Sequence, residues 1–401
     1  MLAKGCVDTP LEGKILASYR WIVLFSCFLA FVAYAFVFQS MPPLLSDAAT
    51  EFNISEAQAG LLMSLAVVPG IVLALPAGFI VVRYRFRRLG FVSILSVAAG
   101  SLITAIADSF PLALLGRFVL GVGGSFIIVG TPAIISQWFD RKDLGKAMGF
   151  YATNMPVATI LAFPTATILA QSYNDWHYPF YVGALLAVVI AFTFVLAVRE
   201  GPLRDHTKSA GAPEIRRALG NSEVWKASLV WMFFNGAAIA YLSWAKTLFE
   251  SYKGLPSLEA SVFASVLMYA AVFFVPIFGW ASDKTAKRKL FLVGGSIAMA
   301  VALIVTSYAS GMALLASVIM LGITAAIVPP VVMTIPSQNL PPSLSGTGFS
   351  IVTLCQNVGI AFAAPYAGYL IQVTGDITAT FFGISLLSLA AAAVALTMKA
   401  K

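Results

Sequence analysis

Long apolar runs separated by short polar breaks repeat along almost the whole chain. A helix needs about 20 mostly apolar residues to cross a bilayer, and that length applied along the sequence predicts twelve spans. The alternating pattern of membrane strands is not found in the sequence. The expected spans are 21–45, 57–82, 90–107, 112–138, 146–170, 178–198, 224–249, 260–282, 290–308, 312–335, 346–371 and 377–398.

The composition supports the same interpretation. Hydrophobic residues make up 60% of the 401 residues and charged residues 10%, whereas a soluble domain is about half apolar and a quarter charged. We therefore expect an all-α integral membrane protein in contact with the lipid bilayer. In that setting the net charge of +8 indicates membrane topology and not a nucleic-acid partner.

The basic residues gather in alternate connections. All but Arg117, Lys246 and Lys253 of the 25 Lys and Arg residues lie in the N-terminal tail, after the even-numbered spans or at the C-terminus. Lys and Arg favour cytoplasmic loops, so we expect a multi-pass protein of the cell (inner) membrane with both termini in the cytoplasm. The first apolar run is too long for a signal peptide, which favours a retained tail.

The longest polar connection, residues 199–223, separates six spans from six. This spacing predicts an N-terminal six-helix bundle at 1–198, a cytoplasmic linker at 199–223 and a C-terminal six-helix bundle at 224–401. Two pairs of adjacent prolines, Pro42–Pro43 and Pro329–Pro330, stand near span ends. Each pair is expected to bend its helix, because proline lacks the N–H that the helix would use.

The two sets of six spans also match each other in sequence. The segment 78–88 corresponds to 279–289, which reads GWASDKTAKRK, at an offset of 201 residues. The same offset aligns further positions that flank the same predicted helices. This register predicts two copies of a six-helix unit, a known transporter plan. The matched pairs are Gly121 with Gly322, Gly145 with Gly346, Pro164 with Pro365, and Gln171 with Gln372.

On these motifs the chain resembles the major facilitator superfamily over essentially its whole length. The loop signature of that family, roughly G-x-L-a-D-R-x-G-R-R, is met in part after the second span and again after the eighth. The fourth span carries GRFVLGVGG, similar to the helix 4 signature of the family, whereas the helix 5 antiporter signature is not matched. The segment QWFDRKDLGKAMGFYATN resembles the branches that carry cyanate, nitrate and organic anions. The loop signature keeps Gly78, Arg83 and Arg87 in the first copy and Gly279, Asp283, Lys284, Lys287 and Arg288 in the second.

The resemblance implies a gate at the cytoplasmic ends of the two bundles. The first copy has Val82 where the family has aspartate, so Asp283 is expected to carry the intact half of an asymmetric contact. The alternative is that these loops serve topology alone. The candidate gate residues are Arg83, Arg87, Arg88, Asp283, Lys284 and Arg288.

Two cations lie within or near predicted spans on the outer side. Arg117 lies about 9 Å along the fourth helix from Pro111. A buried arginine there is costly unless it is paired or faces water. It either contacts the substrate or a coupling ion, or holds helix ends through backbone carbonyls, or extends to the surface. Lys246 is expected either to reach into the cavity or to extend to the outer interface.

Other polar side chains in the spans complete the candidate substrate site. Helix 7 of the family plan places Asn235 and Lys246 on one face, with Tyr241 nearby. Helix 1 offers two polar side chains and helices 5 and 11 offer three. Such residues either bind substrate or form hydrogen bonds between neighbouring helices. These further candidates are Tyr34, Gln39, Asn154, Gln356 and Asn357.

The sequence offers no catalytic or cofactor motif. Cys6, Cys27 and Cys355 are widely spaced, and His177 and His206 fall on opposite sides of the predicted membrane, so we expect no metal site and no cofactor. We do not expect an enzyme. A carboxylate in the middle of a span, which proton coupling often uses, is also not found in the sequence.

The sequence therefore predicts a monomeric twelve-helix secondary active or facilitative transporter. It is expected to move a small solute by alternating access. Arg117 and Lys246 indicate that this solute is an anion. Uniport, exchange and proton coupling remain open, as do the coupling ion and the solute itself. A transporter-like membrane sensor or assembly protein without transport activity is the alternative.

The topology gives a direct prediction. Cysteines introduced near Lys208 and Lys287 should be protected from an impermeant thiol reagent in intact cells. Cysteines near Asp175 and Lys253 should react, because the charge pattern places these positions outside. Reaction at the first pair with protection of the second would reverse the topology.

Overall fold

The computed structural model describes residues 10–84, 86–201, 219–285, 287–341 and 344–399. These residues form helices and no strand, which agrees with the expected fold class. In chain order the helices are α1 (Pro10–Gln39), η1 (Pro42–Leu44), α2 (Leu45–Glu51), α3 (Glu56–Ser64), α4 (Val68–Arg83), α5 (Phe86–Ala105), α6 (Phe110–Ile135), α7 (Arg141–Tyr151), α8 (Asn154–Tyr173), α9 (Tyr178–Ala197), α11 (Ser222–Lys253), α12 (Ser257–Thr285), α13 (Arg288–Tyr308), α14 (Gly311–Ala325), α15 (Val328–Asn339), α16 (Ser345–Thr374) and α17 (Ile377–Leu396).

Twelve helical segments of the described chain are long and apolar enough to cross a membrane. Their order matches the twelve predicted spans, from Tyr19–Glu51 to Ile377–Leu396. The protein is therefore a multi-pass membrane protein. Several ends differ from the sequence expectation by a few residues, most clearly at α1, which begins at Pro10.

Four of the spans are broken into shorter helices, each with a proline close behind the break. α1 gives way to η1 at Pro42, and α4, α8 and α15 each carry a proline within their first three residues. A proline donates no backbone hydrogen bond and leaves a carbonyl of the preceding turn without its usual partner. The breaks at Pro42 and Pro329 lie at the two proline pairs that predict bends. Those before α4 and α8 were not predicted.

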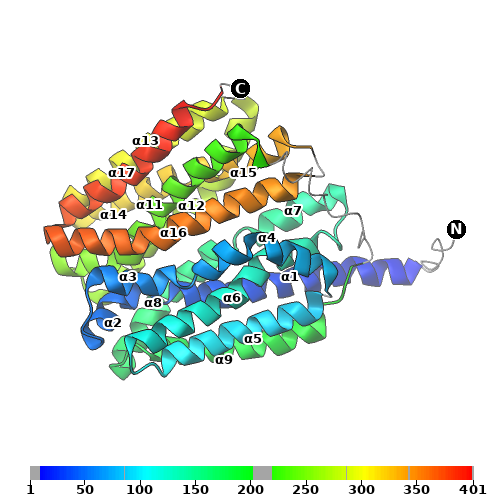
Figure 1. Cartoon of the computed structure of the whole chain (residues 1–401), viewed down its shortest axis with the longest axis horizontal. Coiled ribbons are helices and arrows are strands. Elements are labelled where there is room, and N and C mark those ends of the chain that lie inside the picture. Colours follow the sequence, from blue (N-terminus) through cyan, green and yellow to red (C-terminus); the bar gives the residue numbers. More distant parts are fainter. Residues whose placement is uncertain (1–9, 85, 202–218, 286, 342–343, 400–401) are drawn as a thin grey trace.

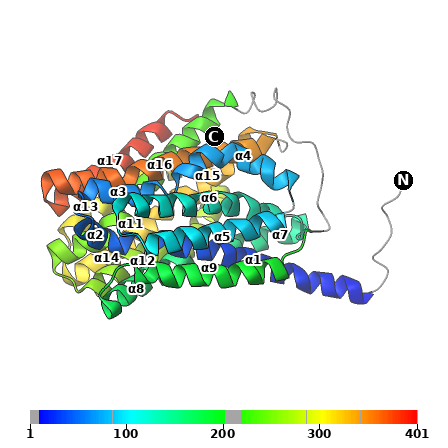
Figure 2. The ribbon, with the colours of Figure 1, turned by 60° about the horizontal axis from the view of Figure 1, so that its bottom comes forward.

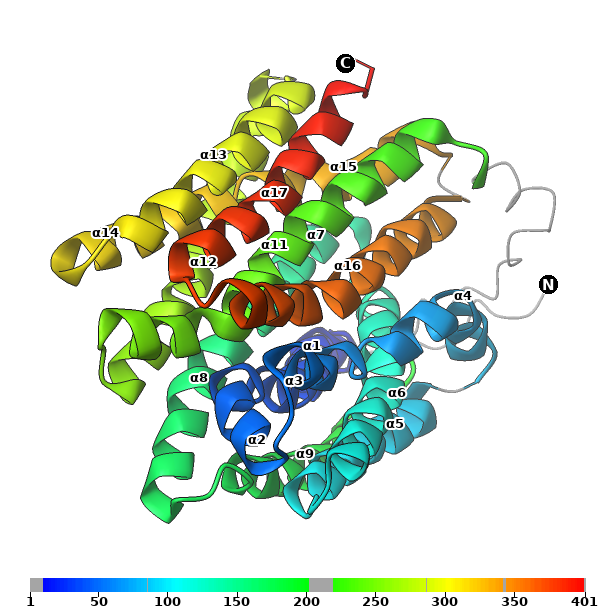
Figure 3. The same cartoon turned by 60° about the vertical axis from the view of Figure 1, so that its left-hand side comes forward.

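The helices form two halves that lie side by side. α1–α9 lie in one half and α11–α17 in the other (Figure 1). Most axes run in a similar direction, and the start of α1 projects beyond the rest (Figure 2). We call the end from which residues 201 and 219 emerge the linker end, and the other the Trp176 end. Figure 3 shows α3 and α16 facing each other between the halves. Whether the halves are separate domains with the predicted boundaries stays a prediction.

Small residues allow close packing inside each half. α5 packs along α6 and α9, and α11 packs along α16 and α17. Between α5 and α6, a Cβ added at Gly100 would lie 2.4 Å from the backbone nitrogen of Leu120. A side chain there would push the two helices apart. Small residues at such crossings are typical of membrane helices, because they let backbones approach.

The halves meet mainly near the Trp176 end. α3 packs on α16, and α8 packs on α12. A Cβ on Gly60 would lie 2.5 Å from the nitrogen of Pro365, and one on Gly368 would lie 2.3 Å from the carbonyl oxygen of Glu56. The hydroxyl of Ser64 donates to the carbonyl oxygen of Ala361 across the same boundary. Two backbones are thus in direct contact here, with little side chain between them.

This contact predicts a difference between two glycines of α16. Gly368→Ala should lower the unfolding midpoint of the purified protein, because its Cβ meets the rigid backbone of α3. Gly346→Ala is the matched control, since its Cβ would meet nothing within 4 Å. It should be neutral or stabilise the helix by about 1 kcal/mol. Equal midpoints for the two variants would show that α3 and α16 do not pack so closely.

Candidate functional site

Arg117 occupies the interior of the first half. The residue is fully buried in α6. Its Nε donates to the carbonyl oxygen of Leu62 at 2.8 Å, Nη1 to that of Val37 at 3.1 Å, and Nη2 to that of Phe38 at 3.1 Å. One guanidinium therefore contacts the backbone of α1 and of α3 at the same time.

The carbonyls that accept from Arg117 belong to two helix ends. α1 ends at Gln39, and Pro42 has no N–H to offer the carbonyl of Phe38. α3 ends at Ser64, two residues after Leu62. The C-terminal end of a helix carries partial negative charge and favours a cation. Two such ends compensate the buried guanidinium, so its charge does not require a carboxylate.

This geometry bears on the alternatives that the sequence left open for Arg117. It is the arrangement of an arginine that holds helix ends through backbone carbonyls. A contact with substrate stays a prediction. In either role Arg117 acts where α1 and α3 break, close to the junction of the halves.

Lys246 lies at a different place, in a cavity of about 770 Å³ at the Trp176 end. We call it the Lys246 cleft. Its walls come from η1, α2, α8 and the connection between α8 and α9 in the first half, and from α11 and α12 in the second. Its lining residues are Leu44, Asp47, Glu51, Thr167, Ala170, Gln171, Asn174, Asp175, Trp176, His177, Lys246, Glu250 and Ser257.

The ammonium of Lys246 is paired inside the cleft. Its Nζ lies 3.2 Å from Oε2 of Glu250, one turn further along α11, and the side chain is only 6% exposed. Asp47 lines the same cavity from α2. The cation is thus not extended to an outer surface, and it has a carboxylate partner that another anion would have to displace.

The wall of the cleft opposite Lys246, which includes Asp175, Trp176 and His177, is fixed by hydrogen bonds within the first half. Nδ1 of His177 lies 2.7 Å from Oδ1 of Asp175, and Nε2 lies 3.0 Å from the carbonyl oxygen of Ala107. The indole of Trp176 donates to Oε2 of Glu51 at 2.6 Å. Two of the four carboxylates are therefore engaged on this wall. The other two carboxylates, Asp47 and Glu250, line the cleft together with Lys246, and Glu250 forms the ion pair with it.

Tyr34 and Asn357 come together in a second, much smaller place. They line a space of about 20 Å³ between the halves, together with Ser125 and Thr353, which is room for about one water molecule. A Cβ on Gly70 would lie 2.5 Å from Nδ2 of Asn357. Both side chains therefore face the boundary at which the halves meet.

The remaining candidates are dispersed. Gln39 is fully buried, and its Nε2 donates to Oγ1 of Thr159 at 2.7 Å. Tyr241 is buried beside the rings of Phe249 and Phe381 inside the second half. The further polar candidates are Asn154, buried; Asn235, whose Nδ2 is buried without a hydrogen-bond partner in the described chain; and Gln356, partly buried.

The structure thus does not gather the predicted substrate residues into one pocket. Lys246 lies in the cleft, Tyr34 and Asn357 lie between the halves, and Arg117 lies within the first half. Their roles stay predictions. Sequence reasoning overlooked Ser64 and Gly368, which contact the opposite half directly. A serine or glycine in an apolar run carries no signal that separates such a position from ordinary packing.

The candidate gate residues make contacts within their own halves. Nε of Arg87 donates to the carbonyl oxygen of Val195 at 2.7 Å, and Arg88 is exposed. Nη2 of Arg288 lies 3.7 Å from Oδ1 of Asp283. The side chain of Arg83 lies outside the described part of the structure.

The last of these gate residues, Lys284, belongs to the second half as well. Its Nζ lies 4.8 Å from the ring centroid of Trp280, on the same helix. None of these contacts joins the halves. The gate role therefore stays a prediction.

The described residues thus form twelve helical segments long enough to span a membrane, arranged in two halves, an architecture that many transporters share. The family model of the Major Facilitator Superfamily matches residues 23–364 and 246–400. The chain belongs to this family, which confirms the resemblance seen in its motifs.

Known proteins with similar sequences include transporters of different solutes. The Probable nitrate/nitrite antiporter NarK1 of Thermus thermophilus is 26% identical over 252 residues, 60% of this chain and 56% of that protein. The similarity thus spans little more than half the length of that relative. The Lysosomal dipeptide transporter MFSD1 of Homo sapiens is 22% identical over 419 residues, 98% of this chain and 89% of that protein.

Solved structures show the same fold. The crystal structure of a bacterial homolog to human lysosomal transporter Spinster, in the inward-facing and unoccupied conformation, matches with a TM-score of 0.78. The match covers 94% of this chain and 95% of that chain at 16% sequence identity. At this identity the match shows the fold alone.

The contacts of Arg117 predict a loss of stability on substitution. Arg117→Ala leaves three buried carbonyls without this donor, and each unsatisfied acceptor costs about 1–3 kcal/mol. Arg117→Lys should also be destabilised, because an ammonium cannot copy the planar fork that reaches two helices. The measurement is the unfolding midpoint in detergent. A native midpoint for Arg117→Lys would mean that the fork geometry is not needed.

Proposed function

We propose that this protein is a secondary active or facilitative transporter that moves a small solute across the membrane by alternating access. The observation that carries the proposal is the placement of the contacts between the halves. At the Trp176 end the backbones of the two halves are in direct contact. At the linker end, the contacts described above for the candidate gate residues lie within their own half. Membership of the Major Facilitator Superfamily and the transport activity named for its relatives support the same function.

The orientation follows from the charge pattern. With Lys and Arg on the cytoplasmic side, the linker end faces the cytoplasm and the Trp176 end faces outward. The structure then corresponds to a state closed on the outside. We propose that the halves close at the linker end in the opposite state, with Asp283 and Arg288 as part of the contact. The cell membrane is the proposed location, with both termini inside.

For the solute, we propose a small molecule with an anionic group that Lys246 binds. Lys246 is nearly buried in the cleft between the halves, and its partner Glu250 is held only by one ion pair in the described structure. A carboxylate or small inorganic anion would take the place of Glu250 and form a charge-assisted hydrogen bond. The nitrate and nitrite named for the Thermus relative are anions of this kind.

A zwitterion is the second candidate, and a specific observation favours it. Asp47 and Glu250 line the same cleft as Lys246, so a solute ammonium would have carboxylate partners while Lys246 binds a carboxylate. The human relative is a dipeptide transporter by name. A monomeric state and the lack of enzymatic activity are part of the same proposal, which leaves open whether a coupling ion takes part.

Lys246 gives the sharpest test of the proposed solute. In proteoliposomes, Lys246→Gln should abolish uptake of the transported solute, and Lys246→Arg should retain most of it, because only the charge is required. Lys253→Gln, which removes a cation of the same helix outside the cleft, is the matched control. Inhibition of flux by nitrate, acetate and glycylglycine should separate anion from zwitterion.

Two outcomes would contradict this proposal in different ways. Normal flux through Lys246→Gln, with neutral solutes competing as well as anions, would contradict the assignment of an anionic solute. It would leave the transporter function unchanged. Binding of solute without any flux in the wild-type protein would instead favour the sensor alternative.

A further inference from the structure

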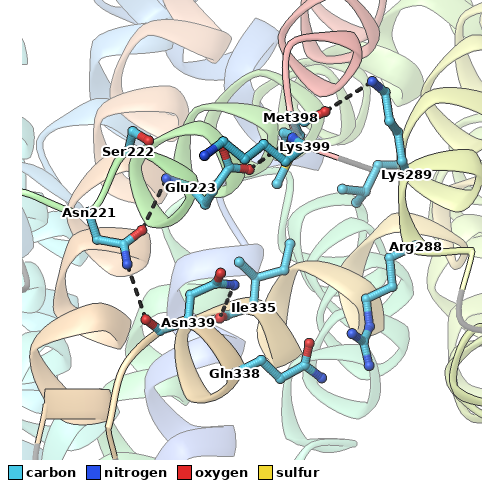
Figure 4. A pocket seen from close by; sticks show the side chains of 11 residues that line it. Asn221, Ser222, Glu223, Arg288, Lys289, Ile335, Gln338, Asn339, Met398 and Lys399 are labelled. Atoms are coloured by element: carbon cyan, nitrogen blue, oxygen red, sulfur yellow. Dashed lines mark hydrogen bonds between the residues drawn. The ribbon is translucent and has the colours of Figure 1, made fainter. Parts of the chain in front are cut away.

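A polar cavity of about 490 Å³ opens at the linker end of the second half. It lies among the starts of α11 and α13, the end of α15 and the residues after α17 (Figure 4). We call it the linker-end pocket. Its lining residues are Asn221, Ser222, Glu223, Arg288, Lys289, Leu292, Ile335, Gln338, Asn339, Met398 and Lys399.

The charge of the pocket is positive. Three of its lining residues are cations, Arg288, Lys289 and Lys399, and one is a carboxylate, Glu223. That carboxylate is already engaged, because Oε1 accepts from Nζ of Lys226 at 2.8 Å and Oε2 from the backbone nitrogen of Lys399 at 3.2 Å. Glu223 therefore offsets the charge of Lys226 and part of that of Lys399, and among the described residues it forms no ion pair with Arg288 or Lys289.

The cations keep donors that are free to bind a ligand. Nζ of Lys289 donates to the carbonyl oxygen of Met398 at 3.0 Å, which uses one of the three N–H bonds of the ammonium. Nε of Arg288 is buried and has no hydrogen-bond partner among the described residues. Its closest carboxylate, Asp283, lies 3.7 Å from Nη2 and is 65% exposed. A buried guanidinium donor without an acceptor indicates a missing partner.

α13, the helix that carries Arg288 and Lys289, adds to the positive potential of the pocket through its N-terminal end. α13 begins at Arg288, and no side chain caps its N-terminal end. The first-turn N–H groups and the positive end of the helix dipole therefore favour an anion at this place. Gln338 and Asn339 of α15 stand on another wall of the pocket (Figure 4). Nδ2 of Asn339 already donates to the carbonyl oxygen of Ile335 at 3.0 Å, so Gln338 is the amide donor offered here.

We infer that the linker-end pocket binds a phosphate group. A phosphate offers several acceptor oxygens in different directions, which suits a guanidinium, an ammonium and a side-chain amide that line one cavity from different helices. The volume leaves room for a substituent on the phosphate. The site lies at the ends of membrane-spanning helices, where basic pockets also take lipid head groups. A phospholipid head group and a soluble phosphate share this chemistry.

The pocket shares Arg288 with the proposed gate, but it lies within the second half and away from the Lys246 cleft, so phosphate binding can be tested apart from solute transport. The test uses the full-length protein, stripped of lipid in a neutral detergent. Phosphatidylglycerol is compared with phosphatidylcholine, and inorganic phosphate with chloride at equal ionic strength. Binding is read from native mass spectra for lipid and from the unfolding midpoint for both.

We expect phosphatidylglycerol, inorganic phosphate or both to bind and raise the midpoint, with no effect of chloride or phosphatidylcholine. Lipid alone would assign a head-group site, and phosphate alone a site for soluble phosphate compounds. Lys289→Gln should weaken binding about tenfold, as loss of one charge-assisted contact does. Lys146→Gln is the matched control, an exposed lysine of the linker end in the other half.

Two results would overturn the inference. One is that neither phosphatidylglycerol nor inorganic phosphate binds the wild-type protein, or that phosphatidylcholine, whose choline cation cancels the charge of its phosphate, binds as well as phosphatidylglycerol. The other is that Lys146→Gln weakens binding as much as Lys289→Gln, which would show a diffuse effect of surface charge. If Lys289→Gln does not fold, Lys399→Gln makes the same comparison without altering α13, and unchanged binding by that variant would count against the pocket.

Discussion

The hydrogen bonds of the Arg117 guanidinium hold two helix ends, and one of these ends, that of α3, lies at the junction of the two halves. A membrane interior offers no water to backbone groups, so each broken helix needs an internal donor for its free carbonyls. α1 and α3 both end inside the first half, and Arg117 donates to both. The two helix ends in turn compensate a charge that would otherwise be very costly at this depth. The break and the cation therefore stabilise each other.

This mutual stabilisation has a consequence for the boundary between the halves. The break after Ser64 leaves α3 as a short helix that packs directly on α16. Gly60 and Gly368 let the backbones approach until no side chain separates them. Contacts between glycine-lined backbones are strong only at close range, so a small separation removes most of their packing. Such a boundary is suited to alternate between closed and open forms.

The fold could be predicted from the sequence because lipid imposes a simple constraint. Spans of about 20 apolar residues, a repeat at 201 residues and the loop motifs were enough for twelve helices and the family. Breaks at Pro42 and Pro329 were visible as proline pairs. The breaks before α4 and α8 were not, because a single proline inside a predicted span does not by itself indicate a break: Pro132 and Pro365 lie inside unbroken helices of this protein.

The candidate site was harder to predict, and the reason is geometric. Residue type shows that Arg117 and Lys246 are unusual in a membrane, but not which way either side chain turns. Arg117 meets carbonyls that become free only because two other helices break. Which carbonyls those are depends on the tertiary structure and not on the sequence near Arg117. Lys246 meets Glu250 one turn away, at a spacing of four residues that places both side chains on one face of the helix. Hydrogen-bond acceptors on the backbone of distant helices leave no pattern in the sequence. Side chains one turn apart on the same helix do leave one.

The most direct measurement of these ideas is the distance between the halves at the Trp176 end. Spin labels at Thr50 of α2 and Val373 of α16, both exposed, report that distance by pulsed electron resonance. The wild-type protein should give a narrow, short distribution, and Arg117→Lys a longer and broader one, because α3 loses its support. An unchanged distribution in Arg117→Lys would show that the boundary does not depend on Arg117.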